Sequence, residues 1–99
     1  MHIKIYIGLT TKDGQVIDNN KAIEDILEIV PFEGYTILQA KGVYKKKLED
    51  SIIIEIYGDE LIDKSSKLID SSFNLAKKLR EHFNQECVMV VVNNKAYFV

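Results

Sequence analysis

Apolar residues change their spacing in a fixed order along this chain, and that order restricts the folds that the chain can adopt. Residues 2–9 alternate apolar and polar side chains, the period-two pattern of a strand with one buried side. A turn at Asp13-Gly14 follows, and residues 21–30 then show the i, i+3, i+4, i+7 spacing of an amphipathic helix. The apolar residues of that spacing are Ile23, Ile26, Leu27 and Val30. Pro31 ends this helix, because proline cannot continue the hydrogen-bonding pattern.

The middle of the chain predicts a hairpin followed by a long helix. Residues 35–44 and 50–57 are strand-like and are joined across a lysine-rich turn. The helix begins between residues 59 and 66 and ends near Asn84. At about 100° per residue, its apolar side chains fall on one arc. That arc consists of Leu68, Ile69, Phe73, Leu75, Ala76, Leu79 and Phe83.

Two short strands complete the chain. Residues 87–92 are strongly apolar, and Asn93-Asn94 suits a two-residue turn into a last strand at 95–99. The order β-α-β-β-α-β with an added C-terminal strand predicts an α+β fold, a ferredoxin-like sandwich. We expect a sheet of mixed polarity packed against two helices, formed as a single domain over residues 1–99.

Charge and cysteine content exclude some classes of function. With 13 basic and 15 acidic residues the formal net charge is −2, whereas a general nucleic-acid binder normally carries a basic excess. Cys87 is the single cysteine, so no disulfide can form within the chain. Together with the absence of a signal-peptide pattern, this favours a cytoplasmic protein, and no apolar run is long enough to span a membrane.

Strand alternation predicts which side chains share a face of the sheet. Facing the helices we expect Ile3, Ile5, Ile7, Leu38, Ala40, Ile52, Ile54, Ile56, Val88, Val90 and Val92. On the opposite face we expect Lys4, Tyr6, Tyr35, Ile37, Gln39, Lys41, Ile53, Glu55, Tyr57, Met89 and Val91. Both predicted helices are needed on the first face, so the second face lacks a cover.

An uncovered face with tyrosines and aliphatic residues is typical of an interface. The predicted interface consists of Tyr6, Tyr35, Ile37, Ile53, Tyr57 and Met89. A second copy of the chain is the simplest partner, which predicts a homo-oligomer, a dimer or higher. The alternative is a monomer, in which the charges of Lys4, Lys41 and Glu55 interrupt the apolar surface.

Cationic residues at two places are candidates for binding a small anion. Tyr44 stands beside Lys45, Lys46 and Lys47 at the predicted hairpin tip, and Arg80 falls at the edge of the apolar arc of the long helix. The alternatives are structural. Lysines in an exposed loop are ordinarily solvated, and Arg80 can pair with a carboxylate. The carboxylates proposed for that pairing are Glu55 and Glu86.

No residue set in the sequence has a pattern typical of catalysis or of a metal site. His2 and His82 are the only histidines, and neither has metal-ligand neighbours at a recognisable spacing. His82 could form an acid-base pair with Glu81 or Glu86, but a solvated surface histidine is the simpler interpretation. Cys87 lacks a base and is interpreted as a small apolar residue. We therefore predict no catalytic residue, no metal and no cofactor.

Several short stretches resemble a family of small uncharacterised bacterial proteins, a domain of unknown function. The stretches are residues 6–9 with the Asp13-Gly14 turn, 34–38 leading to 42–44, 49–53 and 83–88. Members of the family show F-x-L-…-D-G-x-x-V near the start and F-x-Q-E-S-V near the end. This chain has Cys87 in place of the final serine. The resemblance carries no established activity, but it directs attention to Gln85 and Glu86, which could hold the helix-to-strand turn closed or orient Arg80.

These observations leave three functions open. The leading hypothesis is a non-catalytic homo-oligomeric module that binds or sequesters a small anionic ligand such as a nucleotide, a role that a protein from a mobile element could have. The second is a protein-interaction or inhibitor module that docks through the tyrosine-bearing face. The third is a small dimeric ferredoxin-like enzyme that uses His82 or a tyrosine.

Overall fold

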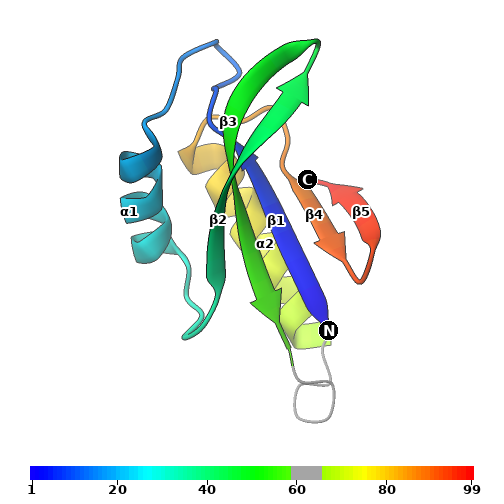
Figure 1. Cartoon of the computed structure of the whole chain (residues 1–99). Coiled ribbons are helices and arrows are strands. Elements are labelled where there is room, and N and C mark those ends of the chain that lie inside the picture. The colour runs from blue at the N-terminus through cyan, green and yellow to red at the C-terminus, as the bar shows by residue number, and fades with distance from the viewer. Residues whose placement is uncertain (59–65) are drawn as a thin grey trace.

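The computed structural model describes residues 1–58 and 66–99, and it contains five strands and two helices in the described part. Figure 1 shows a twisted sheet with the helices packed against it. In chain order the elements are β1 (His2–Gly8), α1 (Asn19–Ile29), β2 (Thr36–Tyr44), β3 (Lys47–Tyr57), α2 (Ser66–His82), β4 (Met89–Val92) and β5 (Lys95–Phe98). The part of the predicted long helix that precedes Ser66 lies outside the described residues.

The sheet is antiparallel throughout, with the strand order β2-β3-β1-β4-β5. The expected mixed polarity is therefore wrong. The reason is that β3 inserts between β1 and β2, so the two strands joined through α1 never become neighbours. The added strand β5 pairs with β4 of the same chain across Asn93-Asn94. Both asparagines adopt the positive φ angles, 46° and 75°, that a two-residue hairpin turn requires.

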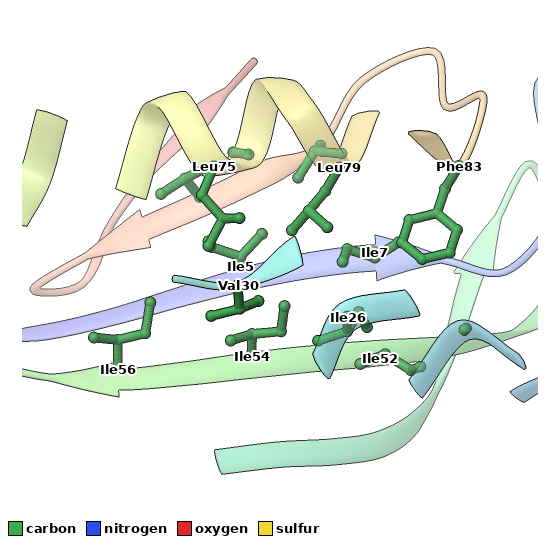
Figure 2. Close-up of a cluster of buried hydrophobic side chains, with 14 of the residues drawn as sticks. Ile5, Ile7, Ile26, Val30, Ile52, Ile54, Ile56, Leu75, Leu79 and Phe83 are labelled. Atoms are coloured by element: carbon green, nitrogen blue, oxygen red, sulfur yellow. The ribbon is translucent and has the colours of Figure 1, made fainter. Parts of the chain in front are cut away.

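The core lies between one face of the sheet and both helices. Ile3, Ile5 and Ile7 of β1 are fully buried and stand opposite the isoleucines at 56, 54 and 52 of β3. Figure 2 shows these side chains meeting those of α1 and α2 in one cluster. Each such residue contributes on the order of 2 kcal/mol to folding through the apolar surface that it removes from water.

Helix α1 begins at a capped end and buries a narrower stripe than expected. The Asp18 carboxylate accepts a hydrogen bond from the backbone amide of Lys21 over 3.1 Å, which satisfies an otherwise unpaired helical donor. Ala22 and Ile26 are the buried residues of the helix. Leu27 was expected in the core but is 60% exposed, because Ala22 rather than Leu27 lies beside Ile26 on the side that faces the sheet.

Helix α2 packs on the same face of the sheet as α1. Its buried side chains are Ser72, Leu75, Ala76 and Leu79, and Phe83, directly after the helix, is buried with them. Leu68, Ile69 and Phe73 are partly buried against the same cluster, so the predicted apolar arc faces the sheet as a whole. No helix in the described residues is long and apolar enough to cross a membrane.

Strand β2 has the opposite phase from the one that the sequence predicted. Ile37 pairs with Ile54 and packs against the core, whereas Leu38 pairs with Ile53 and is 39% exposed on the other face. Leu38 and Ala40 were therefore wrongly assigned to the helix side. A one-residue shift reverses every side chain of a strand. In β2, an edge strand, polar and apolar residues occur on both faces, so its sequence specifies the phase weakly.

Candidate functional site

A cavity of about 450 Å³ lies on the sheet face opposite the helices, which we call the open face. It is formed where β1 ends, between the β2–β3 hairpin and the segment that leads into β4. Figure 1 shows where these three elements lie in the fold. Side chains at alternate positions of all these strands share that face. The lining residues are Tyr6, Ile7, Gly8, Thr10, Thr11, Lys12, Gly42, Val43, Tyr44, Lys45, Glu49, Ser51, Gln85, Glu86, Cys87, Met89 and Phe98.

The β2–β3 hairpin supplies one wall. Lys45 and Lys46 form its two-residue turn with φ angles of 51° and 62°, the left-handed conformation that lysine seldom adopts. The Lys45 ammonium lies 5.3 Å from the centre of the Tyr44 ring, a cation–π distance. Tyr44 and Lys45 line the cavity, but Lys46 and Lys47 do not. The predicted lysine cluster is thus divided between the cavity and the solvent-exposed side of the tip.

Strand β3 directs Glu49 and Ser51 into the cavity. Glu49 pairs with Gly42 of β2, and Ser51 pairs with Gly8 of β1, so each polar side chain has a glycine beside it. Among the described residues, none forms a hydrogen bond or ion pair with the Glu49 carboxylate. A half-buried carboxylate without an internal partner can receive a cationic or hydrogen-bonding ligand.

The turn after α2 supplies the opposite wall. Asn84 adopts a φ of 51°, and the Gln85 amide donates to the backbone carbonyls of Thr10 (3.3 Å) and Phe83 (3.0 Å). Gln85 therefore holds the helix-to-strand turn against the segment that follows β1, in agreement with the structural version of the role proposed for it. Glu86 follows and is exposed at the cavity.

Cys87 also lines the cavity and is exposed, so its expected burial in a strand is wrong. Strand β4 begins at Met89, and the buried residue that precedes it is Val88. Cys87 therefore lies outside the sheet ladder, two residues before β4 begins.

Arg80 lies outside this cavity. It lines a smaller cavity of about 330 Å³ with Lys12, Glu81, Asn84 and Gln85. Its guanidinium comes within 3.9 Å of the exposed Glu81 carboxylate, and neither Glu55 nor Glu86 pairs with it. Arg80 also stands in the last turn of α2, where a cation is favourable to the helix dipole. The predicted binding residues Tyr44 and Arg80 are thus not brought together, although Lys12 and Gln85 border both cavities.

The histidines lie elsewhere. His82 pairs with Asp25 of α1 over 2.8 Å, so it connects the two helices instead of facing Glu81 or Glu86. The hydrogen bond with His82, and to a smaller degree the one with Lys21, lowers the pKa of Asp25 below its ordinary value. His2 stacks on Tyr57 with ring centres 4.2 Å apart, at the far end of the open face. There a hydrogen bond to Glu55 raises the pKa of the Tyr57 phenol.

The predicted interface residues divide between the two faces. Tyr6 and Met89 line the cavity, and Ile53 and Tyr57 also belong to the open face. Tyr35 and Ile37 instead pack against the core on the helix side, because of the reversed phase of β2. Within residues 1–58 and 66–99, no group of acidic, histidine or cysteine residues is arranged to hold a metal ion.

Sequence analysis missed the residues that give the cavity its shape and charge, namely Gly8, Gly42, Glu49, Ser51 and Phe98. The sequence feature that could have identified Glu49 and Ser51 is the phase of β3, that is, which of its residues face the core. Once Ile52, Ile54 and Ile56 face the core, Glu49 and Ser51 must face the other side. That Phe98 lies in the same cavity as Glu49 and Ser51 could not be predicted without knowing which strands neighbour β4.

Solved structures with the same fold are known. The chain matches a phage SAM lyase in the apo state with a TM-score of 0.80 and 24% identity, over 99% of this chain and 86% of that one. It also matches a phage SAM lyase in complex with S-methyl-5'-thioadenosine, with a TM-score of 0.74 and 22% identity, over 99% and 87% of the two chains. No family model and no curated protein matches the sequence. The similarity shows that this chain shares the α+β fold of these lyases.

Proposed function

We propose that this protein binds S-adenosylmethionine (SAM) in the open-face cavity and cleaves it, with release of S-methyl-5'-thioadenosine. The observation that carries the proposal is the cavity itself. It combines aromatic rings with carboxylates that pair with no described residue, in a fold that a phage SAM lyase shares over nearly the whole chain. The solved complex of such a lyase with S-methyl-5'-thioadenosine supports a nucleoside as the ligand class.

The chemistry of the cavity walls suits each part of SAM. Tyr6, Tyr44 and Phe98 provide rings against which an adenine can stack. Glu49 and Glu86 provide negative charge for the sulfonium and the ammonium group, and Lys12 and Lys45 provide positive charge for the carboxylate. The volume of about 450 Å³ is within the range of cavities that hold small ligands.

The reaction itself makes limited demands on the protein. When the bond between the sulfonium sulfur and the methionyl γ-carbon breaks, the bonding electron pair stays on sulfur and yields the neutral thioether. As that bond breaks, the four-carbon portion either loses a proton from its β-carbon to a base, or its own carboxylate attacks the γ-carbon and displaces the sulfur. The second route needs no base.

The proposal revises the order of the three hypotheses. Binding of a small ligand is retained, but the ligand becomes a cationic nucleoside instead of an anion. The non-catalytic module has no support from the comparisons, since both similar structures are lyases. An enzyme that depends on His82 is disfavoured, because His82 pairs with Asp25 away from the cavity.

Two further assignments belong to the same proposal. We assign the ferredoxin-like arrangement to strands β2-β3-β1-β4, with β5 as an added edge strand. We also retain the homo-oligomer. It is supported by exposed apolar residues near the tip of the β2–β3 hairpin, Val43 (72%) and Leu48 (68%), which a second copy would cover. Light scattering after gel filtration tests this assembly, and a monomer at micromolar concentration would contradict it.

Product analysis tests the proposed activity. The purified protein is incubated with SAM, and the products are identified by mass spectrometry. We expect S-methyl-5'-thioadenosine together with a four-carbon product, either an unsaturated amino acid or a lactone, which reveals the route. Glu49→Gln is expected to lower turnover, and Gly34→Ala, at an open loop position that does not line the cavity, serves as the control. Unchanged SAM after prolonged incubation would contradict the proposal.

A further inference from the structure

The Glu49 side chain rests in a hollow made by two glycines. Its Cγ atom lies over Gly42 of β2, where an added Cβ would be 3.9 Å away. Its carboxyl group extends from β3 to Gly8 of the neighbouring strand β1. There an added Cβ would stand 2.6 Å from Oε1, 3.1 Å from Cδ and 3.3 Å from Oε2. All three atoms of the carboxyl group thus occupy space that any side chain at position 8 would need.

The backbone does not require glycine at position 8. Among the glycines of the described residues, Gly14 is the one with a positive φ angle, so Gly8 has a conformation open to all residues. Gly8 also lies in the centre of the sheet, where glycine weakens a strand and often marks the close approach of another group. The group that approaches here is the Glu49 carboxyl.

No other described contact holds that carboxyl in place. Glu49 forms no hydrogen bond or ion pair with a described residue. The shape of the hollow is therefore what directs it, and the free position above Gly8 lets the carboxylate project into the cavity at the end of β1. A side chain at position 8 would rotate the flexible end of Glu49 away without disturbing the backbone.

We propose that Gly8 is a positioning residue, which leaves room for the Glu49 carboxylate to contact the positive sulfur of the ligand. This contact sets a preference for cationic over neutral adenosyl ligands. The inference rests on the proposed function and adds to it the origin of charge selectivity. A carboxylate near a cation in a partly solvated cavity contributes roughly a tenfold preference. The same contact would favour release of the product, because cleavage turns the sulfonium into a neutral thioether.

Two stable ligands test the selectivity without turnover. Sinefungin carries an ammonium group at the place of the sulfonium, and S-adenosylhomocysteine is neutral there. Dissociation constants for both are measured by calorimetry on the parent protein, Gly8→Ala and Glu49→Gln, with Gly34→Ala as a matched glycine control. We expect Gly8→Ala and Glu49→Gln to reduce the affinity ratio of the two ligands about tenfold, mainly through weaker sinefungin binding. Gly34→Ala should keep the parental ratio.

A rescue variant separates positioning from a general structural effect. Glu49→Asp shortens the side chain by one methylene and withdraws its carboxylate from position 8. The double variant Gly8→Ala, Glu49→Asp should therefore fold and should equal the single variant Glu49→Asp in its affinity ratio. That comparison remains decisive if Gly8→Ala alone fails to fold. A double variant whose affinity ratio falls clearly below that of Glu49→Asp alone would overturn the inference, because it would show that Gly8→Ala acts other than through the Glu49 carboxylate.

The outcomes distinguish this inference from the function on which it rests. If the parent protein binds neither ligand, the proposed function fails and the inference fails with it. If the parent binds both ligands but Gly8→Ala keeps the parental ratio, the proposed function stands and only the positioning role is overturned.

Discussion

The two faces of the sheet differ in how their side chains are used. On the helix face, the isoleucines at 3, 5, 7, 52, 54 and 56 are at most 3% exposed and pack into one cluster with both helices. On the open face, the intervening positions carry tyrosines, charges and the Glu49 carboxylate, which pairs with no described residue. The first face holds the fold together, and the second leaves polar groups available to a ligand. The same alternation along each strand produces both.

The largest difference in stability between the two faces is expected at neighbouring isoleucines of β3. Ile54 is fully buried and Ile53 is half-buried on the open face. Ile54→Ala should lower the free energy of unfolding by about 2–5 kcal/mol, because it removes apolar contacts and leaves a cavity. Ile53→Ala should cost less than about 1.5 kcal/mol, since water already reaches that side chain. Urea denaturation of both variants measures the difference, and equal losses would contradict the distinction between the faces.

A smaller effect is expected at the hairpin tip. Lys46 has a φ of 62° and does not line the cavity. Lys46→Gly should raise the free energy of unfolding by about 1 kcal/mol, because glycine adopts this conformation without the steric penalty. Binding of S-methyl-5'-thioadenosine should not change. A large loss of binding would restore Lys46 to the ligand site, as the sequence first suggested.

A still smaller change is expected inside the core. Ser72 of α2 is fully buried, and its hydroxyl has no hydrogen-bond partner in the part of the chain that the structure describes. Ser72→Ala should be neutral or should stabilise the protein by less than about 1 kcal/mol, since an unpaired buried hydroxyl is unfavourable. Thermal denaturation followed by circular dichroism measures the change. A clear destabilisation would show that the hydroxyl has a partner.

The smallest effect at neutral pH is expected at the surface pair between the helices. Hydrogen bonds from His82 and Lys21 lower the pKa of Asp25, so its contribution to stability is complete above the pKa of the unfolded chain. That contribution is lost as the pH falls through the lower pKa of the folded state. In Asp25→Asn the free energy of unfolding should therefore fall less steeply below about pH 4 than in the parent protein. Denaturation across pH 2–6, with the exposed Asp70→Asn as the control, tests the direction. If Asp25→Asn loses as much stability between pH 6 and pH 2 as the parent protein, the expected direction is contradicted.

Periodicity in the sequence predicts strongly patterned elements better than weakly patterned ones. The core positions of β1 and β3 follow from strict alternation of isoleucines, and the structure places them as expected. Strand β2 has apolar residues on both faces, so its phase depends on pairing with β3, which is a tertiary property. Leu27 was misplaced for a similar reason, because the orientation of α1 depends on the sheet against which it packs.

The cavity was harder to predict than the core. Tyr44 and Lys45 were found because they stand at a turn with an obvious chemical character. Glu49 has no such character in the sequence, because an acidic residue near the start of a strand is common. Its significance comes from Gly8 and Gly42, two glycines that lie far apart in the sequence and meet on either side of it. Sequence spacing within one strand carries no information about that arrangement.

The most direct test of the account is a map of where the nucleoside binds. Backbone amide spectra of the isotope-labelled protein are recorded during titration with S-methyl-5'-thioadenosine. We predict shifts concentrated at the cavity on the open face, at Gly8, Gly42, Ser51 and Met89. Amides of the outward side of α1, such as Glu24 and Glu28, should stay in place. Shifts confined to the smaller cavity at Arg80, or no shifts at millimolar nucleoside, would contradict the open face as the ligand site.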